Sequence, residues 1–252
     1  MNKIIVLLTL HFFSLPMFSQ DSNNLIDKTT ENKTLDFSKV FIGEKFKTDD
    51  RTQESQRTEP IGFFGDSYQR FYIHFISVVQ NTNNPLEYFV FGKTKLKDNI
   101  STFQGIIQIK EIEELIRHEY PEFTHGKING TYSFYEDTKK NGSGKFEGIF
   151  HSYWLIDEEN EVEYDAMMIG ADGYSNNMFN GYWISYKTGK EYQCNWGDYR
   201  IPESGDLDMG AGEFFPNDQY MNKGWQTYLD QFGDPDKPET QKAREVENAK
   251  WW

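Results

Sequence analysis

Residues 130–157 read GTYSFYEDTKKNGSGKFEGIFHSYWLID. Aromatic residues alternate with small or polar ones on both sides of a central KKNGSG, and Asn, Gly and Ser are residues that favour turns. The alternation has the period of two that is typical of strands with one buried face. We therefore predict a β-hairpin here, with strands at 130–137 and 145–157.

The same pattern continues along the chain in both directions, with turn clusters such as NTNNP and KTGK between the runs. Eight short strands joined by short loops predict an all-β fold, and we expect an antiparallel up-and-down meander barrel of about eight strands, with a β-sandwich as the alternative. Helical spacing is weak, and 111–120 is the one stretch that could form a short helix. The other six predicted strands are 70–79, 87–97, 100–112, 162–170, 178–186 and 191–196.

A repeated motif favours the barrel over the sandwich. Phe-x-Gly followed by two large apolar residues occurs three times, with its glycines at Gly105, Gly148 and Gly181. A glycine inside a strand permits a bulge or a sharp bend, which closure of a barrel requires. Alternation also predicts which side chains point inward. These are Phe146, Gly148, Phe150, Ser152 and Trp154 in one strand, Phe179, Gly181, Trp183 and Ser185 in another, and Phe71, Ile73, Phe75, Ser77 and Val79 in a third.

The two ends of the chain differ from its middle. Residues 1–20 hold Lys3, an apolar run and a polar exit, a pattern typical of a signal peptide and too short for a membrane span. Residues 21–60 are polar, and we expect a weakly ordered leader in which only 35–37 and 40–42 dock on a core. The barrel is expected over 61–232. In the tail, 233–252, we expect a short helix that starts near Pro238 and terminal tryptophans that pack on the body.

Composition excludes several classes of function. The formal net charge is −14, about −15 without Lys3, and such a surface repels phosphate, which disfavours nucleic acid and anionic membranes as partners. The one cysteine, Cys194, cannot form an internal disulfide, has no neighbouring histidine and is expected to be a buried small apolar residue. The five histidines lack the spacing of zinc ligands, and we predict neither a catalytic residue nor a required cofactor.

One acidic, Gly-rich stretch, residues 203–213, reads ESGDLDMGAGE. Carboxylates two residues apart beside glycines resemble the start of a calcium loop, so Asp206, Asp208 and Glu213 are the candidate metal ligands. The alternative, which we favour, is a Gly-rich connection whose carboxylates accept backbone N–H bonds.

The neighbouring WGDYRIP, residues 196–202, supplies candidate ligand-binding residues. Arg200 either pairs with nearby carboxylates and locks the loop, which we favour, or binds an anionic group of a ligand. Large aromatic rings at the inward face or the end of a barrel can contact an apolar ligand. The candidate ligand-binding set is Trp154, Trp183, Trp196, Tyr199 and Arg200.

The meander from Arg70 to Trp196 and its Phe-x-Gly strands resemble a calycin-type barrel, the architecture of lipocalins and avidins. The lipocalin Gly-x-Trp signature is absent, and the nearest match reads Phe63-Phe64-Gly65, so no ligand residue is carried over. The Phe-Ser-Gln exit of the leader and the Asn- and Lys-rich start that follows it resemble those of exported Bacteroidota proteins. The resemblance implies an exported barrel, periplasmic or extracellular.

Three functions follow as hypotheses. The first is a non-enzymatic binding module that holds a small apolar or aromatic ligand in the barrel or at its mouth. The second is an acidic protein-binding module, of inhibitor or immunity type, for a basic partner. The third is a hydrolase that uses carboxylates within 198–213. An empty cavity larger than about 300 Å³ would favour the first hypothesis.

Overall fold

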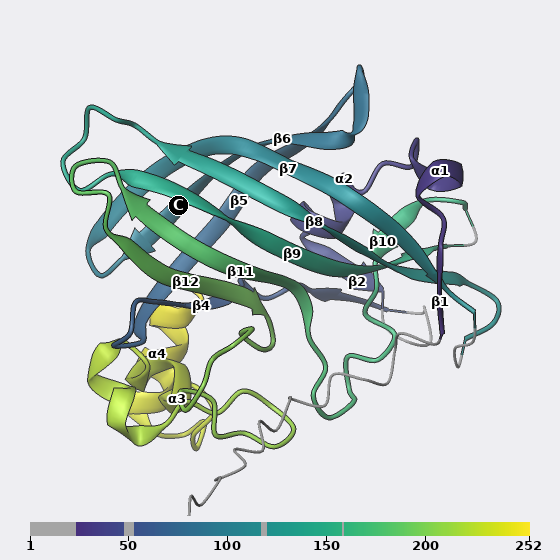
Figure 1. Cartoon of the computed structure of the whole chain (residues 1–252). Helices are drawn as coiled ribbons and strands as arrows, with labels where there is room; N and C mark the ends of the chain where they lie inside the picture. The colour runs from purple at the N-terminus through teal and green to yellow at the C-terminus, as the bar shows by residue number, and fades with distance from the viewer. Residues whose placement is uncertain (1–23, 48–52, 117–119, 158) are drawn as a thin grey trace, which may run out of the picture.

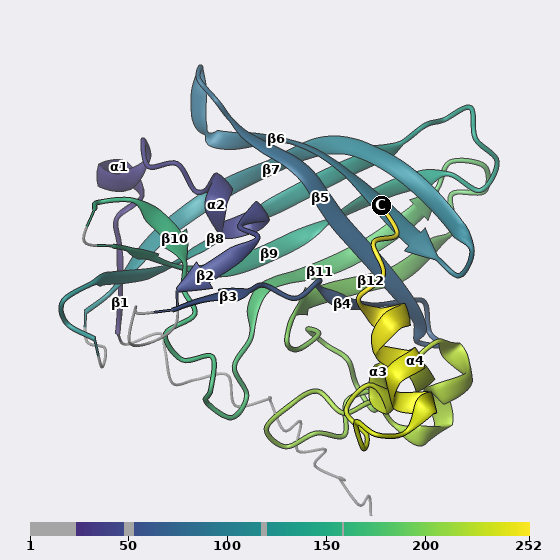
Figure 2. The same cartoon turned by 180° about the vertical axis from the view of Figure 1, so that it is seen from behind.

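The computed structural model describes residues 24–47, 53–116, 120–157 and 159–252. An antiparallel meander of eight strands closes into a ring, because β12 pairs with β4 (Figures 1 and 2). The predicted all-β meander of about eight strands is confirmed, although the ring is not a regular barrel. Its strands are β4 (Ile61–Phe64), β5 (Gln69–Asn81), β6 (Asn84–Leu96), β7 (Asn99–Leu115), β8 (Thr124–Glu136), β9 (Gly144–Ile156), β11 (Asn176–Ser185) and β12 (Glu191–Asp198).

The irregularity lies at β4, a strand of four residues that closes the ring. Residues 62–64 of β4 pair with 69–71 of β5, and β5 then continues along β6. The helix α2 (Ser38–Ile42) packs against β5, β9 and β10 (Val162–Tyr164), and Figure 2 shows it beside β5. Its Phe41 ring lies 5.6 Å from that of Phe150 and 6.5 Å from that of Phe179, both inside the ring. We conclude that α2 fills the seam that the short β4 leaves open.

Aromatic side chains fill the interior of the ring. Phe179 stacks between Trp196 and Phe150, with ring centroids 5.0 and 5.3 Å away, and Tyr132 meets Phe179 and Trp196 edge-on. Trp154 is fully buried at one end of the same cluster. Aromatic side chains bury large areas, so this cluster supplies much of the stability of a chain whose one cysteine is free. The predicted inward face of 146–154 is confirmed.

The Phe-x-Gly glycines serve close packing. Gly148 and Gly181 are directly opposite each other in β9 and β11. A Cβ on Gly148 would lie 2.1 Å from the carbonyl oxygen of Asn180 and 2.7 Å from the Cα of Gly181. The register shifts lie between Phe75 and Ser77 and between Gln80 and Asn81 in β5, within 109–111 of β7, and within 176–179 of β11, and none falls on a glycine of the motif. The motif therefore marks a close approach of backbones, not a bulge.

Two predicted elements differ from the structure. Of residues 162–170, only β10 (Val162–Tyr164) is a strand, and it pairs with β9 outside the ring. The backbone N–H of Met167 bonds to the Asp165 carboxylate and turns the chain there. The stretch 111–120, named as one that could form a short helix, begins as a strand, because β7 continues through Leu115; residues 117–119 lie outside the described ones. The eighth strand of the ring is instead β4, which the sequence pattern did not indicate.

The bulge between Phe75 and Ser77 corrects a third expectation. An extra residue in one strand reverses the alternation that follows it. Val78 is therefore buried, and Val79, which was expected inside, is 57% exposed. The predicted inward face of β5 holds for Phe71 and Ile73, ahead of the bulge.

Short elements flank the ring on both sides. The predicted docking of 35–37 and 40–42 is confirmed, because Phe37 and Val40 are fully buried and Leu35 and Ile42 pack against the core. They are not the only parts of 21–60 that dock, since residues 25–27 pair with β7 and Phe46 is buried in a second cluster. The predicted helix near Pro238 is α4, and the terminal tryptophans pack on β5, as expected. The flanking elements are β1 (Leu25–Asp27), α1 (Thr29–Asn32), β2 (Lys45–Lys47), β3 (Glu54–Gln56), a 3-10 helix (Asp218–Lys223), α3 (Gln226–Asp230) and α4 (Pro238–Glu247).

The predicted signal peptide, residues 1–20, lies outside the described residues. In the described part of the chain, none of the helices has the length and apolar character that crossing a membrane requires.

The close approach at Gly148 gives a stability prediction. Gly148→Ala places a methyl group against backbone atoms, and we expect it to lower the free energy of unfolding by about 1–3 kcal/mol. Gly170→Ala is the matched control, because a Cβ on Gly170 meets no atom within 4 Å. Urea unfolding of both variants measures the difference, and equal stability of the two would contradict the packing argument.

A half-buried histidine makes stability depend on pH. His151 lies on the outer face of β9, between Asn129 of β8 and Met178 of β11. Burial, with a smaller contribution from the charge of Lys127, lowers the pKa of His151 to about 4. The unfolded chain then binds more protons than the folded chain between the folded value and about pH 6.5, so stability falls as the pH drops through that window.

We expect the stability lost between pH 7 and pH 5 to be larger in the wild type than in His151→Gln, by on the order of 1–2 kcal/mol. Urea unfolding of both proteins at several pH values measures this difference. Parallel pH profiles for the two proteins would show that His151 does not carry the effect.

Candidate functional site

The acidic, Gly-rich stretch forms the corner that follows β12, with Arg200 at its centre. The guanidinium of Arg200 donates to the carbonyl oxygens of Gly212 (2.7 Å) and Gly210 (3.1 Å) and lies 2.8 Å from Asp208 Oδ2. Asp208 Oδ1 accepts two backbone N–H groups of the same loop, at 2.9 and 3.1 Å. These contacts lock the corner, which is the role that the sequence favoured for Arg200.

The three candidate metal ligands do not come together. The Asp206 carboxylate accepts from Gln219 Nε2 (2.8 Å) and from the Tyr220 hydroxyl (2.9 Å), whereas Asp208 holds Arg200. Glu213 is exposed at the rim of a separate cleft. Across the described ranges, no three His, Cys, Asp or Glu side chains group as a metal site would require.

Of the five candidate ligand-binding residues, two line a large cleft and three do not. Trp196 and Tyr199 line one large cleft, although Trp196 is almost wholly buried in the aromatic cluster. Trp154 is buried in the ring, the indole of Trp183 donates to a Glu136 oxygen at 2.9 Å, and Arg200 holds the corner. Cys194 is fully buried, as expected, and burial raises the pKa of its thiol.

The cleft has a volume of about 880 Å³ and lies where the seam of the ring meets the flanking segments. Its walls come from 56–61, the β5 residues 72–75, the loop 169–174 and the tail 247–252. Figure 2 shows the tail running upward beside β5. Phe179 and Trp196 lie at the buried side of the cleft, whereas Phe232 at its rim is 67% exposed.

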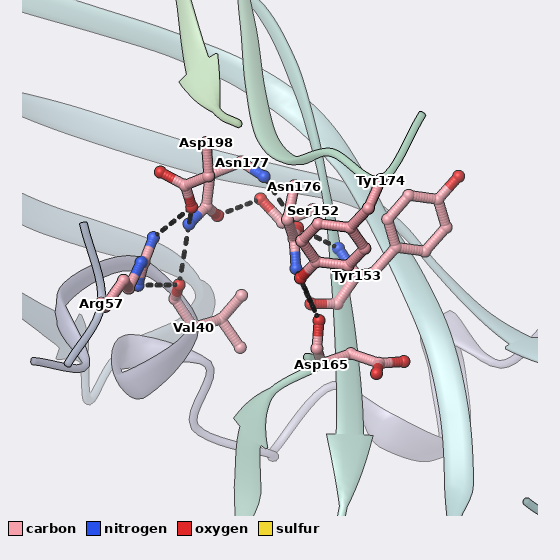
Figure 3. A network of polar contacts seen from close by, with 9 residues as sticks. All are labelled: Val40, Arg57, Ser152, Tyr153, Asp165, Tyr174, Asn176, Asn177 and Asp198. Atoms are coloured by element: carbon pink, nitrogen blue, oxygen red, sulfur yellow. Dashed lines mark hydrogen bonds and ion pairs between the residues drawn. The ribbon is translucent and has the colours of Figure 1, made fainter. Parts of the chain in front are cut away.

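At the floor of the cleft, Arg57 belongs to the lining and forms an ion pair with Asp198, which is fully buried behind it; Figure 3 shows the pair. Arg57 Nη2 lies 2.7 Å from Asp198 Oδ2, and the two side chains are 7% and 0% exposed. Arg57 Nη1 also donates to the carbonyl oxygen of Val40 in α2, at 2.9 Å. Asn177 Nδ2 donates to both Asp198 Oδ2 (2.9 Å) and the same Val40 oxygen (3.0 Å). These four residues join α2, the segment before β4, β11 and the end of β12.

The network continues along β11 to the connection after β10 (Figure 3). Asn177 accepts a hydrogen bond from the Ser152 hydroxyl at 2.6 Å. Asn176 bonds the backbone of Tyr153 through both its oxygen (2.7 Å) and its nitrogen (3.0 Å). The Tyr174 hydroxyl donates to the carbonyl oxygen of Asp165 at 2.6 Å. Backbone groups that the ring cannot pair are thereby satisfied by side chains.

Electrostatics at the floor favour a fixed charge pair. Burial raises the pKa of the Asp198 carboxyl, and Arg57 and Asn177 oppose that rise. Burial acts to lower the pKa of Arg57, but the charge and the hydrogen bond of Asp198, together with the neighbouring Tyr164 and Tyr174, outweigh burial and raise the pKa. Burial also raises the pKa of Tyr174 far above its ordinary value, so its hydroxyl keeps its proton. The floor thus holds one compensated ion pair and neutral donors.

The outer wall combines aromatic rings with carboxylates. His74 Nδ1 lies 3.1 Å from both oxygens of Glu59, and the His74 ring stacks on Trp252 with centroids 4.0 Å apart. Arg70 makes a two-pronged ion pair with Glu247 at 2.6 and 2.8 Å. The guanidinium of Arg70 also lies over three rings, those of Tyr72 (4.7 Å), Tyr228 (5.1 Å) and Trp225 (5.2 Å). These contacts fix α4 and the tail to β5.

The sequence did not single out Arg57, Asn177, Glu59 or His74. Arg57 and Glu59 lie in the polar leader, where nothing distinguishes them from their neighbours. Asn176 and Asn177 follow a predicted turn, and that was the one available signal. Asn177 has a positive φ of 45°, a left-handed conformation that asparagine adopts more readily than most residues.

No protein-family model matches this chain, and no curated protein or solved structure is significantly similar to it.

The buried ion pair gives a third stability prediction. Asp198→Asn leaves the Arg57 guanidinium buried without a counter-charge, and we expect a loss of about 3–5 kcal/mol in the free energy of unfolding. The exposed pair Lys45–Glu54 is the control, because its side chains are 60% and 56% exposed. Lys45→Met is expected to cost less than about 1 kcal/mol.

Urea unfolding of the two variants measures the contrast. The double variant Arg57→Met with Asp198→Asn should lose less stability than the sum of the two single changes, because no charge is left unpaired. Strict additivity would show that the two side chains do not act as a pair.

Proposed function

We propose that this protein is an exported, non-enzymatic binding module of calycin-like type, which holds a small apolar or aromatic ligand in the cleft at the seam of its ring. The observation that carries the proposal is the cleft of about 880 Å³, which falls within the size range of small-molecule sites. Its aromatic wall and its few fixed polar groups fit that class of site. Export rests on the sequence of residues 1–20.

The place of the proposed ligand differs from that in an open barrel. Phe150, Phe179 and Trp196 fill the ring, so the ligand would lie beside the aromatic cluster, between the seam and the tail. A rigid floor suits such a site, because a preorganised pocket loses less entropy when a ligand binds. The Arg57–Asp198 pair supplies that rigidity.

A second candidate function is an acidic module for a basic protein partner. It is favoured by the net charge of −14 and by exposed apolar side chains on the outer face of β5 and β6. Val79 pairs directly with Phe89 there, and they are 57% and 50% exposed, with Phe91 nearby at 42%. Phe89→Asp separates the two functions: it would leave ligand binding in the cleft unchanged and would weaken the binding of a partner that docks on this face.

The hydrolase hypothesis has less support. Of the acidic residues within 198–213, Glu213 alone lines the cleft among the described residues.

The cleft can be tested with neutral aromatic compounds and one blocking substitution. Gly170 lines the cleft, and a side chain there has open space before it. We expect indole, 2-naphthol and 2-phenylethanol to bind the wild type and Gly170→Ala, and Gly170→Trp to lose most of that binding. Ligand-observed NMR titration measures the affinities. Absence of binding to the wild type, or equal binding to Gly170→Trp, would overturn the proposal.

A further inference from the structure

The charges around the cleft indicate which ligands it would prefer. Two of its basic residues are already neutralised by carboxylates of the chain. Arg57 is paired with Asp198, and Arg70 is paired with Glu247 through both guanidinium nitrogens. The remaining basic residue, Lys250, is exposed and lies 5.5 Å from the centre of the Trp252 ring.

Four carboxylates of the lining, those of Glu44, Glu59, Asp172 and Glu213, are not neutralised in this way. Glu59 contacts the neighbouring His74, and its side chain is 35% exposed. Asp172 and Glu213 are exposed, and within the described part of the chain neither has a basic partner. With the overall charge of −14, these groups give the cleft a negative potential.

Aromatic rings lie on the same walls as these carboxylates. Trp252 stacks on His74 next to Glu59, and Phe232 stands exposed at the rim. Tyr199 adds a third ring, in edge contact with Tyr174 at 5.3 Å. A ring face attracts a cation through its quadrupole, and a nearby carboxylate adds to that attraction.

Two arginine side chains of the protein are bound by the same combination of an aromatic ring and a carboxylate. Arg70 lies over three rings and is paired with Glu247, and Arg57 lies 4.2 Å above the Tyr164 ring and is paired with Asp198. Both cations stand in or beside the cleft. The same chemistry is available to a ligand on the part of the wall that the chain leaves unpaired.

We propose that the cleft prefers a small organic cation, an ammonium or guanidinium group on an aromatic or apolar body, over neutral or anionic compounds of the same shape. This inference rests on the proposed function and names its ligand class. The apolar body would lie along the aromatic wall, and the cation would face Glu59, Asp172 and Glu213.

Three probes that share a phenylethyl body and differ in charge test the inference: 2-phenylethylammonium, the neutral 2-phenylethanol and the anionic 3-phenylpropanoate. We expect the ammonium to bind at least about fivefold more tightly than the alcohol, and the carboxylate to bind most weakly. The preference for the ammonium should shrink as salt rises, because salt screens exposed charges. NMR titration of the full chain gives all three affinities.

Matched variants locate the effect. Glu213→Gln and Asp172→Asn should each reduce the preference for the ammonium over the alcohol, whereas Glu191→Gln, an exposed carboxylate away from the cleft, should leave it unchanged. Equal or tighter binding of the alcohol or the carboxylate would overturn the cation preference and leave the proposed function standing. Binding of none of the three probes would overturn the proposed function and the preference together.

Discussion

The contact between Arg57 and Asp198 is the constraint on which the rest of the structure depends. The ring closes through β4, a strand too short to cover β5, and α2 must fill the seam. The carbonyl oxygen of Val40 in α2 has two donors, Arg57 and Asn177, and both also bind Asp198. One carboxylate at the end of β12 thereby positions the N-terminal segment, the seam and the floor of the cleft together.

The aromatic core inside the ring and the cleft at its seam are therefore two separate parts of the molecule. The aromatic cluster around Phe179 occupies the interior of the ring, so the ring acts as a core and not as a container. Space remains beside the short β4, at the part of the seam that the flanking segments do not fill. The cleft is therefore a consequence of the short β4, and its rim is built from segments that differ most from a regular meander.

Local patterns in the sequence predicted the local elements. The alternation around the NGSG turn gave a hairpin, and Pro238 marked the start of α4, because each depends on neighbouring residues. The strand predicted over 162–170 ends at Tyr164. Its apolar residues have the pattern of a strand, but the Asp165 carboxylate accepts the backbone N–H of Met167 and the chain turns there. The floor could not be predicted, since Arg57 and Asp198 are 141 positions apart and only the closed ring brings them together. Asp206 and Asp208 matched a metal motif in spacing, but Asp206 accepts from Gln219 and Tyr220, and Asp208 binds Arg200 and backbone N–H groups of its own loop.

Native-state amide hydrogen exchange of α2 tests this account most directly. The backbone N–H groups of Val40 and Gly43 bond to Phe37 and Lys39 within the helix region, which alone is too short to protect them. If the Arg57–Asp198 pair holds α2 in the seam, these two amides exchange only with global unfolding, at the same free energy as amides of β9. Exchange of Val40 and Gly43 at a free energy far below that of β9 would show that α2 opens independently of the ring, and would contradict the account.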